Sequence, residues 1–259
     1  MHYTREMILE SFRNSRVLRM YVMDYGLFRV HSNGRVIGIT GSLIETDDGK
    51  WVLVDTGFPR KYVENREQSS REDSLYEFGE ILQLDADNLP AGQLAKLGLT
   101  PDDIDLQILT HTHIDHVGGL MEFTHVPMVI NKAERALDRP LYWHGLHPFG
   151  WPEDQDYIEV EGDTEILPGL TLLETPGHTP GQTSLLLDLP KTGAVILTSD
   201  TISRPEELEE GFAGYWREDM AEKHARRLMA IAAERDAFVI FGHCPRQWPT
   251  LRKLPEYYD

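Results

Sequence analysis

The sequence predicts an α/β protein in which strands and helices form separate layers. Short apolar runs such as residues 51–54 and 106–109 are typical of buried strands. One helix is clear from apolar residues that recur at the i, i+4, i+7, i+11 spacing of a single helix face, Ala221, Ala225, Leu228 and Ala232. Because strands alternate with helices along the chain, we expect layers of both kinds packed on each other.

The individual elements are expected in the following order along the chain. The first half predicts strands at residues 17–24, 36–46, 51–54 and 106–109, and helical stretches at residues 74–84 and 91–97. The second half predicts strands at residues 170–174, 194–197 and 238–241, with the clear helix before the last of them. Residues 142–151 combine aromatic residues with Gly and Pro and lack a helical period, so they predict a loop. The acidic run at residues 206–210 predicts a solvated loop or helix face.

Composition predicts one compact domain over residues 1–259. The chain has 41% apolar residues, enough for a sizeable core, and no Pro/Ser-rich linker, low-complexity tract or internal repeat divides it. The sequence leaves open whether the chain forms a homodimer.

Charge and cysteine content exclude several classes of partner. Lys and Arg number 25 against 43 Asp and Glu, and the resulting net charge of −18 opposes nucleic acid as a substrate. The single Cys excludes an internal disulfide and favours a reducing compartment, the cytoplasm. Residues 1–19 carry scattered charges and no apolar stretch, so we expect neither a signal peptide nor a membrane span.

The segment His-Thr-His-Ile-Asp-His directly follows the strand at residues 106–109 and carries four potential metal ligands. Residues two apart in extended backbone point to the same side, so His111 and His113 can hold one metal ion. The glycines at residues 118–119 should turn the chain, which lets Asp115 and His116 reach a second ion.

Three further candidate ligands each follow a predicted strand: His178, Asp200 and His243. Because α/β folds bind ligands outside the carboxyl ends of their strands, these side chains are expected to meet the first cluster. Together the seven residues predict a two-metal hydrolytic site.

This pattern, HxHxDH with a later His, Asp and His, resembles the metallo-β-lactamase superfamily. The resemblance implies an αββα four-layer sandwich. It assigns His111, His113 and His178 to a first metal ion and Asp115, His116 and His243 to a second, with Asp200 bridging the two. Imidazole and carboxylate ligands suit two zinc ions, although iron, cobalt or manganese would also be accepted.

Further segments, from about residue 42 onward, resemble the N-acyl homoserine lactonases, quorum-quenching enzymes that open a lactone ring. These segments are residues 53–57, 97–104, 161–163, 167–170, 175–182, 212–214, 241–243 and 254–257. The resemblance implies a small lactone or ester as substrate. Water held between two metal ions would be available as hydroxide at neutral pH and would attack the acyl carbon, with Asp115 relaying its proton. Asp115 and Asp200 are therefore the candidate catalytic residues.

Other functions remain open at this point. The true two-zinc β-lactamases usually carry Cys where Asp200 stands, and diiron flavoproteins typically carry Glu in place of His113, so neither branch fits. A glyoxalase II-like thioester hydrolase, or another ester or phosphoester hydrolase of this fold, would use the same ligands. A metal-dependent binding protein without catalysis is the third alternative.

One departure from the lactonases concerns substrate binding. They usually present a Tyr three residues after the bridging Asp, whereas this chain has Ser203. Candidates for contacts with the substrate are Ser203 itself, His144, His147, Tyr215 and Trp216.

Two residues next to the predicted ligands need separate interpretation. Asp55 ends an apolar strand, and its carboxylate could accept hydrogen bonds from the ligand loop and fix its geometry. Cys244 follows His243 and is expected to be a small buried thiol and not a nucleophile.

Overall fold

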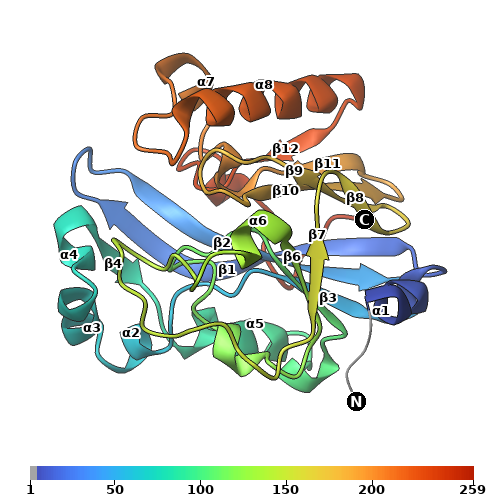
Figure 1. Ribbon diagram of the computed structural model, residues 1–259, viewed down its shortest axis with the longest axis horizontal. Coiled ribbons are helices and arrows are strands. Elements are labelled where there is room, and N and C mark those ends of the chain that lie inside the picture. Colours follow the sequence, from blue (N-terminus) through green and yellow to red (C-terminus); the bar gives the residue numbers. More distant parts are fainter. Residues whose placement is uncertain (1–4) are drawn as a thin grey trace.

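The computed structural model of the protein describes residues 5–259 and contains two β-sheets packed face to face (Figure 1). Residues 1–4 of the predicted single domain lie outside the described residues. The first sheet has the order β4-β1-β2-β3-β5-β6-β7. Its strands are β1 (Val17–Val30), β2 (Val36–Thr46), β3 (Trp51–Val54), β4 (Gly79–Gln83), β5 (Leu106–Leu109), β6 (Met128–Asn131) and β7 (Tyr157–Val160).

The second sheet has the order β12-β11-β10-β9-β8. Its strands are β8 (Thr164–Leu167), β9 (Leu170–Glu174), β10 (Thr183–Leu189), β11 (Gly193–Leu197) and β12 (Phe238–Ile240). The α-helices are α1 (Arg5–Phe12), α2 (Lys61–Glu64), α3 (Arg66–Glu72), α4 (Leu75–Phe78), α5 (Pro90–Ala95), α6 (Lys132–Arg135), α7 (Glu207–Glu210) and α8 (Glu218–Glu234). Short 3-10 helices are η1 (Ala86–Asn88), η2 (Pro101–Asp103), η3 (Leu120–Glu122), η4 (Ser199–Thr201) and η5 (Trp248–Thr250).

The sheets enclose one apolar core and each carries a second core on its outer face. Ile44 and Ile108 of the first sheet belong to the same cluster as Leu172 of the second sheet. Every residue of β5 is buried, because both faces of this central strand are covered. Helices α2 and α5 lie on one outside of the sandwich and α8 on the other (Figure 1). The αββα arrangement is therefore confirmed.

Helix α8 packs on the second sheet with the face that the periodicity predicted. Its buried residues are the predicted Ala221, Ala225, Leu228 and Ala232. They share a cluster with Ile196 of β11 and Leu173 of β9. Burial of a leucine side chain contributes about 2 kcal/mol relative to an exposed one, so this face provides a large part of the attachment of α8.

The predicted helix at residues 74–84 is wrong. Only Leu75–Phe78 is helical, and Gly79–Gln83 forms the edge strand β4. Gly79 is extended, with φ −177°, and Ile81 pairs with Phe28 of β1. Pairing with a strand fifty residues earlier therefore overrides the local helical pattern.

Strand β1 is longer than the predicted residues 17–24. It continues to Val30 through an irregularity between Asp24 and Leu27. Gly26 has a φ of +108° there, which favours glycine, and its N–H donates to the Asp24 side chain at 3.0 Å. The remaining predicted strands agree with the structure to within one residue, and the helix predicted at residues 91–97 is Pro90–Ala95.

The topology brings the ends of strands from both sheets together. β3, β5 and β6 run parallel in the first sheet, and β11 and β12 run parallel in the second. The segments that follow β5, β9, β11 and β12 carry all seven predicted ligands. No helix within residues 5–259 is both long and apolar enough to cross a membrane.

Candidate metal centre

The segment after β5 turns at residues 113–117, just before the glycines at residues 118–119 where the turn was predicted. The N–H groups of His116 and Val117 both donate to the carbonyl of His113, at 2.9 and 3.1 Å. This turn reverses the chain directly after the extended pair His111 and His113. Asp115 and His116 therefore point to a different place from the first two histidines.

Six of the seven candidate ligands form two groups, which we call the first and the second half-site. The first half-site is His111, His113 and His178, and the second is Asp115, His116 and His243. Within each group the potential ligand atoms lie within 4.8 Å of one another. A third group, His111, His116 and Asp200, meets the same limit and connects the two half-sites.

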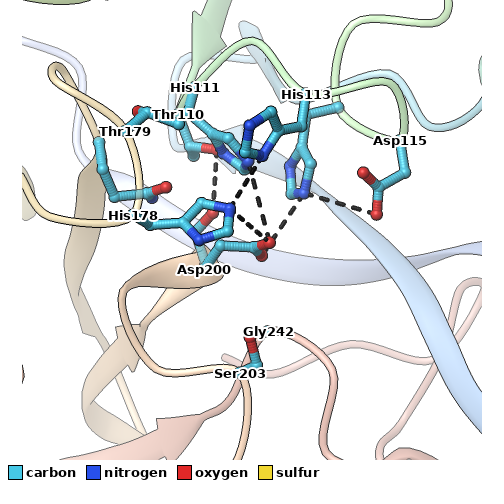
Figure 2. Close-up of polar contacts among 12 residues, drawn as sticks. Thr110, His111, His113, Asp115, His178, Thr179, Asp200, Ser203 and Gly242 are labelled. Carbon is cyan, nitrogen blue, oxygen red and sulfur yellow. Dashed lines mark hydrogen bonds and ion pairs between the residues drawn. The ribbon is translucent and has the colours of Figure 1, made fainter. Parts of the chain in front are cut away.

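The carboxylate of Asp200 lies between the half-sites (Figure 2). Its Oδ2 is 3.3 Å from Nε2 of His178 and 3.8 Å from Nε2 of His111. Its Oδ1 is 3.2 Å from Nε2 of His243 and 3.5 Å from Nε2 of His116. Each oxygen of one carboxylate thus faces a different half-site, which is the arrangement a bridging ligand requires.

Several atoms around Asp200 fit a pair of divalent cations. Ligands placed tetrahedrally about 2.1 Å from zinc are roughly 3.4 Å apart, close to the distances around Asp200. Among the described residues, buried Nε2 of His111, Nε2 of His116 and Oδ1 of Asp200 have no hydrogen-bond partner. Buried polar atoms without a partner are costly, and bound cations would satisfy these three.

The two half-sites have opposite electrostatics. Burial lowers the pKa of His111 and His113, and it lowers the pKa of His178 to about 3. Burial also lowers the pKa of His243, but the carboxylates of Asp200 and Asp115 outweigh this effect and raise the pKa to about 9. The pKa of His116 is likewise raised well above 6.5, by Asp115, Asp55 and Asp200 against burial.

Asp55 contacts the ligand segment from the end of β3. Its Oδ2 is 2.8 Å from Nδ1 of His116 and accepts from the Thr110 hydroxyl at 2.7 Å, while Oδ1 accepts from the Thr110 N–H at 2.9 Å. This contact leaves Nε2 of His116 facing Asp200 and Asp115. Asp55 therefore fixes which ring nitrogen of His116 is available as a ligand.

A second buried carboxylate, Glu134 in α6, was missed in the sequence. Its Oε1 accepts from the N–H and the hydroxyl of Thr112, at 2.9 and 2.6 Å. Its Oε2 accepts from the hydroxyl of Thr179 and the N–H of Gly181, both at 2.9 Å. Thr112 separates His111 from His113, and Thr179 follows His178, so Glu134 joins both chain segments of the first half-site.

Ser203 and Tyr215 lie side by side next to the ligands. The two hydroxyl oxygens are 3.3 Å apart, and the Tyr215 ring contacts the ring of His178 edge-on at a centroid distance of 4.6 Å. Glu207 accepts from the Ser203 N–H at 2.8 Å and from the Tyr215 hydroxyl at 3.3 Å. Glu207 is buried, so the prediction of a fully solvated acidic run is wrong at this residue.

The loop at residues 142–151 packs most of its rings against the body of the protein. The buried hydroxyl of Tyr142 donates to Asp73 at 2.8 Å, and the Trp151 indole N–H donates to the Leu137 carbonyl at 2.8 Å. His144 contacts the neighbouring Trp143 ring, and His147 lies 2.9 Å from the Pro140 carbonyl.

Two other residues singled out in the sequence lie next to ligands. Trp216 is exposed, and its backbone N–H donates to the His178 carbonyl at 3.3 Å. Cys244 is buried, as predicted.

Known proteins share both this sequence and this fold. Residues 35–243 match the family model of the metallo-beta-lactamase superfamily. The chain belongs to this superfamily. It is 35% identical over 220 residues to an N-acyl homoserine lactonase of Bacillus cereus, which spans 83% of this chain and 84% of the relative. It is 33% identical over 223 residues to the N-acyl homoserine lactonase AiiA of Bacillus thuringiensis subsp. kurstaki, with the same coverage.

Solved structures of superfamily members agree with these sequence relatives. A B. thuringiensis AiiA variant with N-decanoyl-L-homoserine at its active site superposes with a TM-score of 0.81 at 28% identity, covering 94% of this chain and 100% of that one. An N-acyl homoserine lactone hydrolase with its product N-hexanoyl-L-homoserine at the catalytic metal center gives a TM-score of 0.80 with the same identity and coverage. The predicted resemblance is confirmed.

Membership of the metallo-beta-lactamase superfamily and the cluster of His and Asp side chains together support divalent metal binding. Histidine nitrogens and carboxylate oxygens are the donors that first-row divalent cations prefer.

Proposed function

We propose that this protein is a hydrolase that opens the ring of N-acyl homoserine lactones with two divalent metal ions, zinc in the first place. The observation that carries the proposal is the carboxylate of Asp200, whose two oxygens face two separate groups of three ligands. Relatives at 33% and 35% identity that are N-acyl homoserine lactonases supply the substrate class.

In this proposal residues 1–259 act as one domain, because the ligands come from both sheets. His111, His113 and His178 would hold one ion, Asp115, His116 and His243 the other, and Asp200 both. The ions would lower the pKa of a bound water toward 7 and polarise the lactone carbonyl. The single Cys favours the cytoplasm as the place of action.

The side chains of this protein have separate tasks in the reaction. Asp115 belongs to the second half-site, with Oδ2 at 3.5 Å from Nε2 of His243, and its side chain is 14% exposed. Its carboxylate would accept the proton of the attacking water and pass it to the alkoxide of the opened ring. Asp55 and Glu134 hold the ligand segments in place, so the site does not reorganise during the reaction.

A substrate panel tests the proposal directly. Metal-loaded protein is mixed with N-acyl homoserine lactones of several chain lengths, a simple γ-lactone, a thioester and a phosphotriester. Ring opening releases a proton, so a pH indicator reports turnover of the lactones. We expect the homoserine lactones to be hydrolysed fastest.

The Asp200→Asn variant should lose this activity, whereas Asp154→Asn, a change of the same kind at an exposed carboxylate, should keep it. Hydrolysis of the thioester or phosphotriester alone would assign a different hydrolase activity to the same site. Saturable binding of lactones without turnover would identify a binding protein.

A further inference from the structure

The segment around Tyr215 lies directly against the loop that carries His178. The backbone N–H of Trp216 donates to the carbonyl of His178 at 3.3 Å, and the backbone N–H of Arg217 donates to the carbonyl of Gly177 at 2.9 Å. The Tyr215 ring meets the His178 ring at an angle of 74°. These contacts fix the phenol beside the first half-site.

The hydroxyl of Tyr215 also meets the segment that carries Asp200. Ser203 stands three residues after Asp200, and its carbonyl accepts from the N–H of His243 at 2.9 Å. The Ser203 hydroxyl is 3.3 Å from the Tyr215 hydroxyl. The phenol thus bridges two ligand-bearing segments, and Figure 2 shows Ser203 on the side of Asp200 away from His111.

Both hydrogen-bonding contacts of the Tyr215 hydroxyl are long. They measure 3.3 Å to Ser203 and 3.3 Å to Glu207, whereas O–H···O bonds are typically about 2.7 to 2.8 Å. Glu207 makes its shorter bond, 2.8 Å, to the Ser203 N–H. The phenol O–H donates to Glu207 over a long distance, and Ser203 can donate to the phenol oxygen, so the phenol O–H can exchange Glu207 for an acceptor on the substrate.

We infer that the Tyr215 hydroxyl donates a hydrogen bond to the substrate oxygen that gains negative charge while the lactone ring opens. The inference rests on the proposed function. Tyr215 keeps its proton throughout, so no bond to hydrogen breaks at this residue. The Ser203 side chain is too short to reach the substrate as a phenol would, and its hydroxyl donates to the Tyr215 oxygen instead. The residue that binds the reacting oxygen thus comes from residues 212–217 and not from the segment after Asp200.

The first test is Tyr215→Phe, which keeps the ring on His178 and removes only the hydroxyl. We expect kcat for N-acyl homoserine lactones to fall about 100-fold, the usual effect of one lost donor to a developing oxyanion. Affinity for the ring-opened product, measured by calorimetry on metal-loaded protein, should fall about fivefold, because one hydrogen bond is lost. Metal content should not change. Tyr257→Phe, an exposed tyrosine on the C-terminal tail, is the matched control and should behave as the parent.

The second test moves the phenol. Ser203→Tyr alone should lower turnover, because its ring competes with Tyr215 for space. Ser203→Tyr combined with Tyr215→Phe should recover at least tenfold over Tyr215→Phe alone. A Tyr215→Phe variant with parental kcat and product affinity would overturn the inference, while the lactonase proposal would stand. A parent protein that opens no lactone would overturn the lactonase proposal itself.

Discussion

Both histidines of the second half-site contact an acceptor outside the ligand set through Nδ1. Nδ1 of His116 contacts Asp55 at 2.8 Å, and Nδ1 of His243 contacts the Gly38 carbonyl at 3.0 Å. In the first half-site only His111 has such a ring contact, a longer one of 3.2 Å to the Thr110 hydroxyl, and Nδ1 of His113 contacts the ligand His178. His178 is half-buried, and its buried Nδ1 has no hydrogen-bond partner among residues 5–259. There Glu134 fixes the chain on either side of the rings instead.

This difference has a consequence for protons. The carboxylates of Asp55, Asp115 and Asp200 surround the second half-site and favour protonated histidines when no metal is bound. In the first half-site Asp200 acts on all three histidines, and Asp115 and Glu134 act on His113, but burial outweighs these carboxylates and keeps the histidines neutral. A metal ion entering the first half-site therefore displaces no proton, but one entering the second must displace protons.

The largest expected effect comes from the residue that the half-sites share. Asp200→Asn removes a charged oxygen from both, so we expect turnover to fall by more than about 100-fold, beyond the loss typical of residues that only support ligands. Elemental analysis after gentle purification should show close to two ions per chain in the parent and fewer than one in the variant. Two ions retained with full activity would show that Asp200 does not join the half-sites.

The next effect concerns the stability of metal-free protein against pH. A histidine whose folded pKa is raised to about 9, such as His243, stabilises the fold below about pH 6.5 and loses this contribution as the pH rises through about 9. His178, with a folded pKa of about 3, acts in the opposite sense, because the unfolded chain takes up a proton below about pH 6.5 and the folded one does not.

We therefore expect chelator-treated protein to be most stable near pH 6.5 and to lose about 3 kcal/mol toward pH 9 from His243. Thermal unfolding between pH 5 and 10 measures this. Metal-loaded protein is the control and should lack the decline between pH 6.5 and 9, because bound ligand histidines carry no proton at the ligand nitrogen. Equal pH profiles with and without metal would contradict the assigned electrostatics.

The sequence predicts the residues of this site that show a regular spacing or directly follow a strand, and it misses those that are buried only by tertiary contacts. Four ligands occur within residues 111–116, and the others each end a strand, so spacing alone brought out all seven candidates. Glu134 and Glu207 left no such signal, because a glutamate in a short polar helix is ordinarily exposed. The partners of Glu134 lie far away in sequence, as do those of the edge strand at residues 79–83, whereas the partners of Glu207, Ser203 and Tyr215, lie in neighbouring loops that show no regular spacing.

A pair of substitutions separates the two modes of support. Asp55→Asn should weaken binding of one ion about 10- to 100-fold, because the amide no longer fixes the His116 ring. The backbone of Asp55, with φ +58°, tolerates asparagine. Glu134→Gln should weaken binding of the ion at the first half-site to a similar extent. The amide NH2 of the glutamine would face the N–H and hydroxyl donors of Thr112 or Thr179, where the carboxylate accepted from them. Competition with a metal chelator measures both affinities.

The same variants in a His178→Ala background show which ion each residue supports. With the first half-site already impaired, Glu134→Gln should have little further effect, whereas Asp55→Asn should still weaken the remaining ion. Equal further losses from both substitutions would mean that the half-sites are not supported separately.

The smallest expected effect tests how far the backbone support of the first half-site extends. Tyr142 pairs with the ligand segment, donating its N–H to the Thr112 carbonyl at 2.8 Å and accepting from the Ile114 N–H at 3.0 Å. Its hydroxyl donates to Asp73, which also binds Tyr62 at 2.7 Å. Tyr142→Phe keeps the backbone pairing and removes only the hydroxyl, so unfolding should become easier by about 1 kcal/mol while turnover changes less than about twofold. Denaturant unfolding of metal-loaded protein gives the first value and the lactone assay the second. A fall in turnover of more than about twofold would show that the hydrogen bonds of Asp73 to Tyr62 and Tyr142, and not the backbone alone, position His113.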